Sequence, residues 1–222
     1  MSMNRREFSQ AATGVAGAVL ASSTLWTGFA HAQAKKPEAG KDYLIVDPRA
    51  PVEAPAGKVD VVEFFGYFCP HCNSFEPTLS AWLKTVPAHV AFRRAHVAFN
   101  DGMAPQQRLF LALEAMGLVE KMQVSVFSAI HKDRIKLSTR DAIVDWVVAQ
   151  GVDKTKFLES YNSFSTATKA SRMTQLQNAY KLEGVPALGI AGRFYIDGTL
   201  AGSMPRVLQI ADYLIAEVKA GR

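Results

Sequence analysis

The residue types and spacing best suited to chemistry in this chain occur in Cys69-Pro70-His71-Cys72, which contains its only two cysteines. Two thiols separated by two residues can pass between a dithiol and a disulfide. We expect the tetrapeptide at the start of a helix, where unpaired backbone N–H groups stabilise a thiolate and His71 can add positive charge. The pattern predicts an acidic, attacking thiol at Cys69 and a less exposed thiol at Cys72 that resolves a mixed disulfide.

Two other uses of the cysteine pair fit the sequence less well. A structural zinc site takes about four ligands, and the histidines offer no second pair at ligand spacing. A purely structural disulfide between Cys69 and Cys72 closes a very short loop, so it restricts the unfolded chain little. We therefore carry forward a redox function with no metal and no organic cofactor, in which the Cys69–Cys72 disulfide is itself the reactive group.

The segments around the motif predict a β-α-β unit, a long helical stretch, a hairpin and a closing helix. The first strand is β-branched and aromatic along both faces, as in a central strand. Beyond Asn100, helical periodicity continues without a convincing strand until the hairpin. The expected bounds are 58–65 for the first strand, 69–84 for its helix, 90–97 for the second strand, 187–196 for the hairpin, and Pro205 for the start of the closing helix.

This order of elements predicts an α/β fold class, with a first and a second strand-containing part on either side of a helical domain. The first part is expected over 33–98 and the second over 176–222, because strand patterns occur in both. The helical domain is expected over 99–175. Residues 1–32 are expected to be a cleaved export signal and to take no part in the fold.

The first 32 residues have the features of an export signal. Arg5-Arg6 precede a weakly apolar stretch rich in alanine, glycine, serine and threonine, which ends in Ala30-His31-Ala32, a typical cleavage site. The paired arginines favour the twin-arginine route, with the Sec route as the alternative. A retained membrane anchor fits less well, because hydroxyl groups interrupt a stretch of marginal length. Export places both cysteines in an oxidising compartment.

The composition excludes several classes of protein. The chain has 222 residues, of which 49% are hydrophobic and 20% are charged, so it is neither a disordered chain nor a small disulfide scaffold. Its net charge is +5, but the lysines and arginines are scattered along the sequence. We therefore expect no nucleic-acid partner.

Three segments of the sequence carry a resemblance to a known family. They are Glu63-Phe64-Phe65-Gly66-Tyr67-Phe68-Cys69-Pro70-His71-Cys72, then Phe75-Glu76, and far downstream Gly184-Val185-Pro186-Ala187. Together they closely resemble the DsbA family, the periplasmic thiol:disulfide oxidoreductases of the thioredoxin superfamily. The resemblance extends over nearly all of the chain after the signal. It implies a thioredoxin fold with an inserted all-helical domain, and a periplasmic protein that oxidises its clients.

The resemblance also implies roles for residues near the cysteines. Pro70 and His71 form the family's own dipeptide, whereas thioredoxins usually carry Gly-Pro, and they are expected to modulate the thiols. Pro186 matches the family's cis-proline, although a proline before a strand is more often trans when the sequence alone is considered. Val185 would then face Cys69 and offer its backbone to an extended client peptide.

Two carboxylates near the motif are further candidates for modulating the thiols. Glu63 shares a strand face with apolar residues, so we expect it to be buried. The matching family position implies that it relays protons to and from Cys72, and the alternative is a carboxylate that touches solvent at a strand edge. Glu76 either pairs with a basic group such as Arg94 or is a solvated surface carboxylate.

The expected partners are reduced exported proteins. By resemblance, a DsbB-like membrane protein linked to quinones would reoxidise the dithiol, and we expect a monomer. Two rival functions stay open. One is a disulfide isomerase or reductase, which would use the same cysteines in the reduced state and is commonly a dimer. The other is a peptide-binding chaperone whose cysteines are only structural.

Overall fold

The computed structural model describes residues 36–222, so the predicted export signal at 1–32 lies outside the described residues. The described part contains a five-stranded sheet in the order β1-β5-β4-β2-β3. β2 and β3 are parallel, and the other neighbouring strands are antiparallel. The strands are β1 (Leu44–Ile45), β2 (Val59–Phe65), β3 (Val90–His96), β4 (Ala187–Ile190) and β5 (Phe194–Asp197).

β2 is covered on both faces of the sheet, and every one of its residues is buried. Its side chains point alternately to the two faces. Val61 packs in a cluster with α1 (Pro70–Leu83) and α8 (Met204–Lys219) on one face. Val62 packs in a cluster with α6 (Phe164–Ala179) on the other face. The continuous apolar run of this strand therefore reflects burial on two sides, as the sequence predicts.

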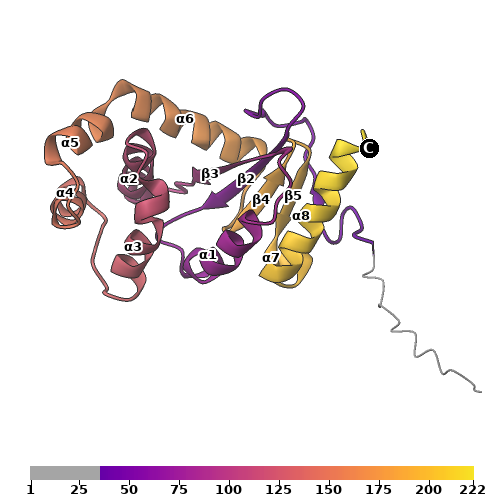
Figure 1. The fold of residues 1–222 in the computed structure, drawn as a ribbon, viewed down its shortest axis with the longest axis horizontal. Coiled ribbons are helices and arrows are strands. Elements are labelled where there is room, and N and C mark those ends of the chain that lie inside the picture. Colours follow the sequence, from indigo (N-terminus) through magenta and orange to yellow (C-terminus); the bar gives the residue numbers. More distant parts are fainter. Residues whose placement is uncertain (1–35) are drawn as a thin grey trace, which may run out of the picture. The chain divides into compact units, whose positions relative to one another are not determined.

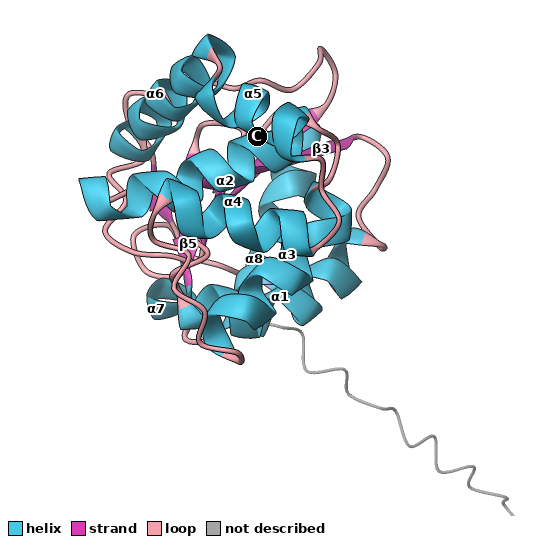
Figure 2. Cartoon of the chain, turned by 90° about the vertical axis from the view of Figure 1, so that its left-hand side faces the viewer, coloured by secondary structure: helices cyan, strands magenta, loops and turns pink. Residues whose placement is uncertain are grey.

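Four further helices gather beyond the end of the sheet at which β2 and β3 finish (Figure 1). Figure 2 looks onto this helical block from its outer side. Its core is made of apolar side chains from all four helices, which pack into a single cluster. The helices are α2 (Ala104–Ala115), preceded by a short 3₁₀ turn at Asp101–Met103, then α3 (Val119–His131), α4 (Arg140–Ala149) and α5 (Lys154–Asn162).

The two cysteines lie where the sheet meets this block. Cys69 and Cys72 belong to the same apolar cluster as Phe65, at the end of β2, and Phe110, on α2. The rings of Phe65 and Phe110 pack edge to face, with centroids 5.2 Å apart. The segment that carries both cysteines is thus enclosed by residues from the sheet and from the helical block.

The strand, helix and hairpin bounds predicted above agree with the observed ones to within one residue, whereas α6 begins and ends two residues before the helix expected over 166–181. The structure adds one short helix, α7 (Gly198–Ala201), which begins where the Asp197 side chain accepts the backbone N–H of Leu200 at 2.8 Å. The predicted end of the helical domain at residue 175 falls inside α6, which continues to Ala179. The division into domains therefore stays a prediction. In the part of the chain that is described, no helix has the length and apolar character needed to cross a membrane.

Candidate active site

Cys69 is the N-cap residue of α1, which confirms the predicted position of the motif at a helix start. Its backbone is extended, with φ −90° and ψ 115°, and its sulfur accepts the backbone N–H of Cys72 at 3.2 Å. Pro70 takes the first helical position, where the missing N–H of proline has no helical partner to lose. Both thiols are free, and Cys72 is 1% exposed against 6% for Cys69. The predicted order of exposure is confirmed.

The two thiols have opposite acidities. Hydrogen bonds lower the pKa of Cys69 to about 6, with the Cys72 side chain as the largest contribution. The backbone N–H groups of Cys72 and His71 and the charge of the exposed His71 add to this effect, and burial opposes it. Burial raises the pKa of Cys72 far above its ordinary value, and the hydrogen bond to Cys69 adds to the rise. Near neutral pH, Cys69 is therefore a thiolate beside a thiol.

A cis peptide bond joins Val185 to Pro186, as the resemblance implies, and a second one joins Asp47 to Pro48, which the sequence analysis did not predict. The Val185 carbonyl oxygen lies 3.3 Å from the Cys69 sulfur and accepts its S–H when this thiol is protonated. Within residues 36–222, the backbone N–H of Val185 has no hydrogen-bond partner. The backbone of this loop therefore presents a donor and an acceptor beside the sulfur, and an extended peptide can pair with such groups.

Glu63 lies on β2 directly opposite Arg94 on β3 and is 1% exposed. The predicted burial is confirmed, and the alternative of a solvent-touching carboxylate is wrong. The Nε atom of Arg94 lies 3.5 Å from Oε2 of Glu63, and this oxygen has no hydrogen-bond partner among the described residues. Burial raises the pKa of Glu63 to about 8, because the charged form loses its hydration and Arg94 only partly compensates.

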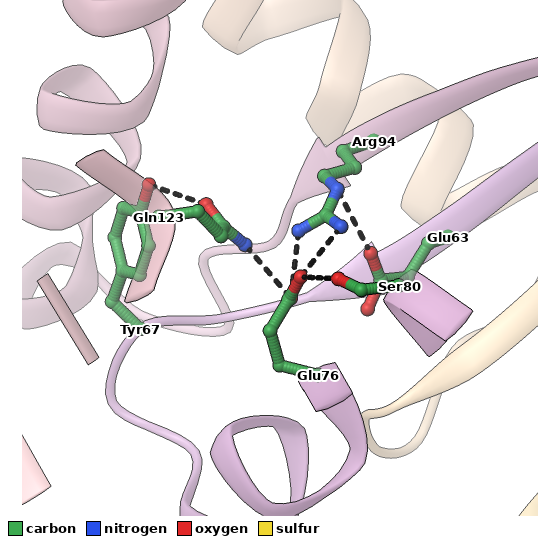
Figure 3. Close-up of polar contacts among 6 residues, drawn as sticks. All are labelled: Glu63, Tyr67, Glu76, Ser80, Arg94 and Gln123. Atoms are coloured by element: carbon green, nitrogen blue, oxygen red, sulfur yellow. Dashed lines mark hydrogen bonds and ion pairs between the residues drawn. The ribbon is translucent and has the colours of Figure 1, made fainter. Parts of the chain in front are cut away.

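Glu76 pairs with Arg94, so the alternative of a solvated surface carboxylate is wrong. The two terminal nitrogens of Arg94 donate to the two oxygens of Glu76 at 2.7 and 2.8 Å. The Ser80 hydroxyl donates at 2.9 Å and the Gln123 amide at 3.3 Å (Figure 3). Burial opposes ionisation of this carboxyl, but the hydrogen bonds from Arg94, Ser80 and Gln123 outweigh it and lower the pKa of Glu76.

Tyr67 ties the helical block to the segment that carries Cys69. Its hydroxyl donates to Gln123 on α3 at 2.9 Å, and its backbone carbonyl bonds to Nε2 of His131 at 2.8 Å. Its backbone N–H donates to Nε2 of His96 at 3.0 Å. Burial lowers the pKa of His96 to about 3, so its ring is neutral, and the acceptor role of Nε2 assigns the proton to Nδ1. Two side chains thus hold the backbone two residues before Cys69, and a third holds the Tyr67 hydroxyl.

Sequence reasoning did not identify Gln123 or His131. Gln123 precedes Val126 by three residues and Phe127 by four, and His131 follows Phe127 by four. Residues at these spacings share one face of a helix. A polar side chain inside an apolar helical stripe is a signal of burial with a specific partner, and this signal was available in the sequence.

Residues 36–222 contain no group of three or more His, Cys, Asp and Glu side chains arranged to hold a metal ion. The chemistry that the observed geometry offers is exchange at the Cys69 sulfur, with Cys72 within reach as the second thiol. The strand-to-helix junction, the cis-proline loop and the mixed sheet are those of a thioredoxin-fold thiol:disulfide oxidoreductase.

Comparison with known proteins gives the family. A model of the DSBA-like thioredoxin domain matches residues 99–209. The thiol:disulfide interchange protein DsbA of Burkholderia cepacia is 40% identical over 201 residues, which are 90% of this chain and 95% of that protein. The protein of the same name from Pseudomonas aeruginosa is 40% identical over 203 residues, 91% and 95% of the two chains. The chain belongs to the DsbA family.

Solved structures agree with this assignment. The crystal structure of Pseudomonas aeruginosa DsbA superposes with a TM-score of 0.80 at 38% identity, over 85% of this chain and 97% of that one. Reduced DsbA1 from Neisseria meningitidis superposes with a TM-score of 0.74 at 27% identity, over 85% and 98% of the two chains. The predicted thioredoxin fold with inserted helices is confirmed.

Proposed function

We propose that this protein is an exported disulfide donor that transfers its Cys69–Cys72 disulfide to reduced client proteins. The observation that carries the proposal is the contrast between the two thiols. Cys69 has a pKa of about 6, and Cys72 has a strongly raised pKa. A stabilised thiolate favours the reduced protein over its disulfide, by roughly 30 mV of potential for each pKa unit of a two-electron couple. The pair is therefore oxidising toward clients with ordinary thiols.

The reaction proceeds by two exchanges. A client thiolate attacks the Cys69 sulfur of the oxidised protein and forms a mixed disulfide, while the Cys69–Cys72 bond breaks and its electron pair leaves on Cys72. Cys72 then takes up a proton. A second client thiolate attacks the client's own sulfur in the mixed disulfide and releases Cys69 as a thiolate. The client loses two electrons, and the protein gains them.

The neighbouring residues support these steps. Glu63 is a neutral acid below pH 8, and it donates the proton that Cys72 takes up and accepts it again on reoxidation. Val185, before Pro186, pairs with the client backbone next to the attacked sulfur. Glu76 modulates the site through its salt bridge to Arg94.

The partners follow from this chemistry and from the family. Clients are exported proteins with reduced cysteines, and a DsbB-like membrane protein returns the dithiol to the disulfide. The protein works as a monomer in the periplasm after removal of its signal, without a metal or an organic cofactor. The twin-arginine pattern at Arg5-Arg6 supports the proposed export route.

The first test is the redox equilibrium of the mature protein with glutathione, read by thiol trapping of Cys69 and Cys72. We expect a potential well above that of the glutathione pool, because the Cys69 thiolate stabilises the reduced form. A potential below that of glutathione would instead establish a reductase. Protection of clients that survives replacement of both cysteines by serine would establish a chaperone.

Cys72→Ser is expected to trap glutathione on Cys69. At pH 7 a thiol with a pKa of about 6 is roughly 90% ionised, whereas an ordinary thiol is only a few per cent ionised. The variant should react rapidly with oxidised glutathione and then keep the mixed disulfide, since no second thiol resolves it. Mass spectrometry measures the adduct. Equal reactivity of Cys69→Ser, in which only the buried Cys72 remains, would contradict the assignment of the attacking thiol.

His71→Leu is expected to raise the pKa of Cys69 and to lower the reduction potential, by about 30 mV or less. The effect is small because the charge of His71 is the last of the contributions that lower this pKa. Titration of the thiolate's ultraviolet absorbance and the glutathione equilibrium measure the two values. Ser74→Ala, an exposed and uncharged neighbour on α1, is the control. An unchanged pKa and an unchanged potential in His71→Leu would show that His71 does not modulate Cys69.

A further inference from the structure

The carboxylate of the buried Glu76 accepts four hydrogen bonds. Arg94 supplies two of the hydrogen bonds, Ser80 the third and Gln123 the fourth (Figure 3). An ionised carboxylate offers about four acceptor positions, so those of Glu76 are filled. Its salt bridge with Arg94 has the two-bond geometry that is the strongest form of such a pair.

Glu63 also lies beside the Arg94 guanidinium, but its contact with this group is longer than that of Glu76. The contact between Arg94 and Glu63 is that of Nε with Oε2 at 3.5 Å, whereas both terminal nitrogens of Arg94 bond to Glu76 at 2.8 Å or less. At 3.5 Å the two atoms form no hydrogen bond, and the contact becomes an ion pair only when Glu63 ionises. The β2–β3 register places Glu63 and Arg94 opposite each other, so the backbone alone would allow them to pair.

The orientation of Glu76 is set from the helical block by Gln123. An ionised carboxylate only accepts hydrogen bonds, so Gln123 must turn its NH₂ group toward Glu76 and its oxygen toward the Tyr67 hydroxyl. Ser80, one turn along α1 from Glu76, holds the other oxygen. Gln123 is 3% exposed, so its amide depends on these partners to offset the cost of burying it. The side-chain conformation of Glu76 is thus held by Ser80 on α1 and by Gln123 on α3.

We propose that Glu76, oriented by Gln123 and Ser80, holds the guanidinium of Arg94 away from Glu63 and so keeps Glu63 able to give a proton to Cys72. This inference rests on the proton role that the proposed function gives to Glu63. Gln123 and Ser80 act through Glu76 and are positioning residues. When Cys72 leaves, the Glu63 carboxyl loses one proton and becomes a carboxylate, and the Cys72 thiolate becomes a thiol. Reoxidation reverses this transfer.

The charged and titratable groups around Glu63 come from both sides of the site. They are Arg94 on β3, Glu76 with Cys69 and Cys72 at α1, Tyr67 after β2, and Glu120 on α3, which acts on Arg94. Across β4 the opposite residue is the apolar Leu188. Arg94 alone among the groups acting on Glu63 lowers its pKa. The position of one guanidinium therefore decides how long Glu63 stays protonated as the pH rises.

The test follows the ionisation of Glu63 directly. Carboxyl ¹³C NMR of the reduced, full-length protein labelled at glutamate gives the titration midpoint, and the Glu63 signal is identified by its loss in Glu63→Gln. In Glu76→Gln, Arg94 loses its competing carboxylate, so the Glu63 midpoint is expected to fall by about 1–3 pH units. Gln123→Met leaves Glu76 charged but free to turn, and should cause a smaller fall.

The control is Glu114→Gln, which removes one carboxylate from the exposed Lys169 pair and should leave the Glu63 midpoint in place. A Glu63 midpoint that stays near 8 in both Glu76→Gln and Gln123→Met would overturn the inference. Gln123→Met keeps all charges of the network, so it provides the answer if Glu76→Gln does not fold.

A kinetic measurement separates this inference from the proposed function. The rate at which reduced glutathione attacks the oxidised protein, divided by the thiolate fraction of glutathione, should fall above the pH at which Glu63 ionises in the oxidised protein. This pH lies below the midpoint of the reduced protein, because the disulfide lacks the Cys69 thiolate that raises the pKa of Glu63. The pH at which this rate begins to fall should be lower in Glu76→Gln, by the same shift as the NMR midpoint. If the NMR midpoint shifts but the rate profile of Glu63→Gln equals that of the unaltered protein, the positioning stands and the proton role of Glu63 fails.

Discussion

Glu63→Gln is expected to stabilise the reduced protein by an amount that increases from pH 5 to pH 8. The pKa of Glu63 is raised to about 8 in the folded protein from 4.5, so between these values the folded state binds the proton that the unfolded state releases. Stability therefore falls as the pH rises through this window, and levels off above the folded pKa. The glutamine is neutral throughout and removes this loss, which is on the order of 4 kcal/mol at pH 8.

Urea unfolding of both proteins under reducing conditions, at pH values from 5 to 9, measures this difference in the free energy of unfolding. The difference cancels the pH dependence of other groups, such as Cys69, that both proteins share. Glu114→Gln is the matched control, because it removes an exposed carboxylate and should give a flat difference. A difference of Glu63→Gln that does not change with pH would show that Glu63 is ionised in the folded protein at neutral pH.

Arg94→Met is expected to be strongly destabilising at neutral pH. Arg94 is buried and is the cation that both Glu63 and Glu76 contact. Removing one partner of a buried ion pair leaves an uncompensated charge and costs about 3–5 kcal/mol. Both carboxyl groups would then have raised pKa values, so the variant should become more stable as the pH falls from 8 toward 5.

The same unfolding measurement checks this prediction. Lys169→Met is the control, because it removes the cation of an exposed pair with Glu114, and such pairs contribute about 1 kcal/mol or less. A loss below 1 kcal/mol in Arg94→Met, or a stability that does not improve on acidification, would mean that the two carboxyls do not depend on this guanidinium.

These two expectations have a common physical cause. An acid that must be neutral near pH 7 has to be buried, and burial makes its ionisation costly to the fold. A cation is nevertheless needed for Glu76, which is ionised. The arrangement around Arg94 meets both requirements, because Arg94 donates its hydrogen bonds to Glu76 and none to Glu63.

The acidity of Cys69 shows where reasoning from the sequence was incomplete. The helix start and His71 were predicted to stabilise the thiolate, and both do. The largest contribution is instead the side chain of Cys72. A spacing of two residues indicates that the thiols lie close together, but it does not give the direction of their hydrogen bond. That direction depends on the burial of Cys72 in the cluster shared with the helical block.

The sequence predicted the order of elements and the burial of Glu63, which the structure confirms, and it predicted Cys69 as the attacking and Cys72 as the resolving thiol. These are local properties, because apolar periodicity, a helix start after a central strand and a four-residue motif all lie within short segments. The resemblance of three segments added the family and the cis bond before Pro186. The pairing of Arg94 with Glu76 could not be read from short segments, because it depends on contacts of Glu76 with Gln123 and Ser80. Gln123 is distant from Glu76 in the chain, and its partner is fixed by packing between the sheet and the helical block.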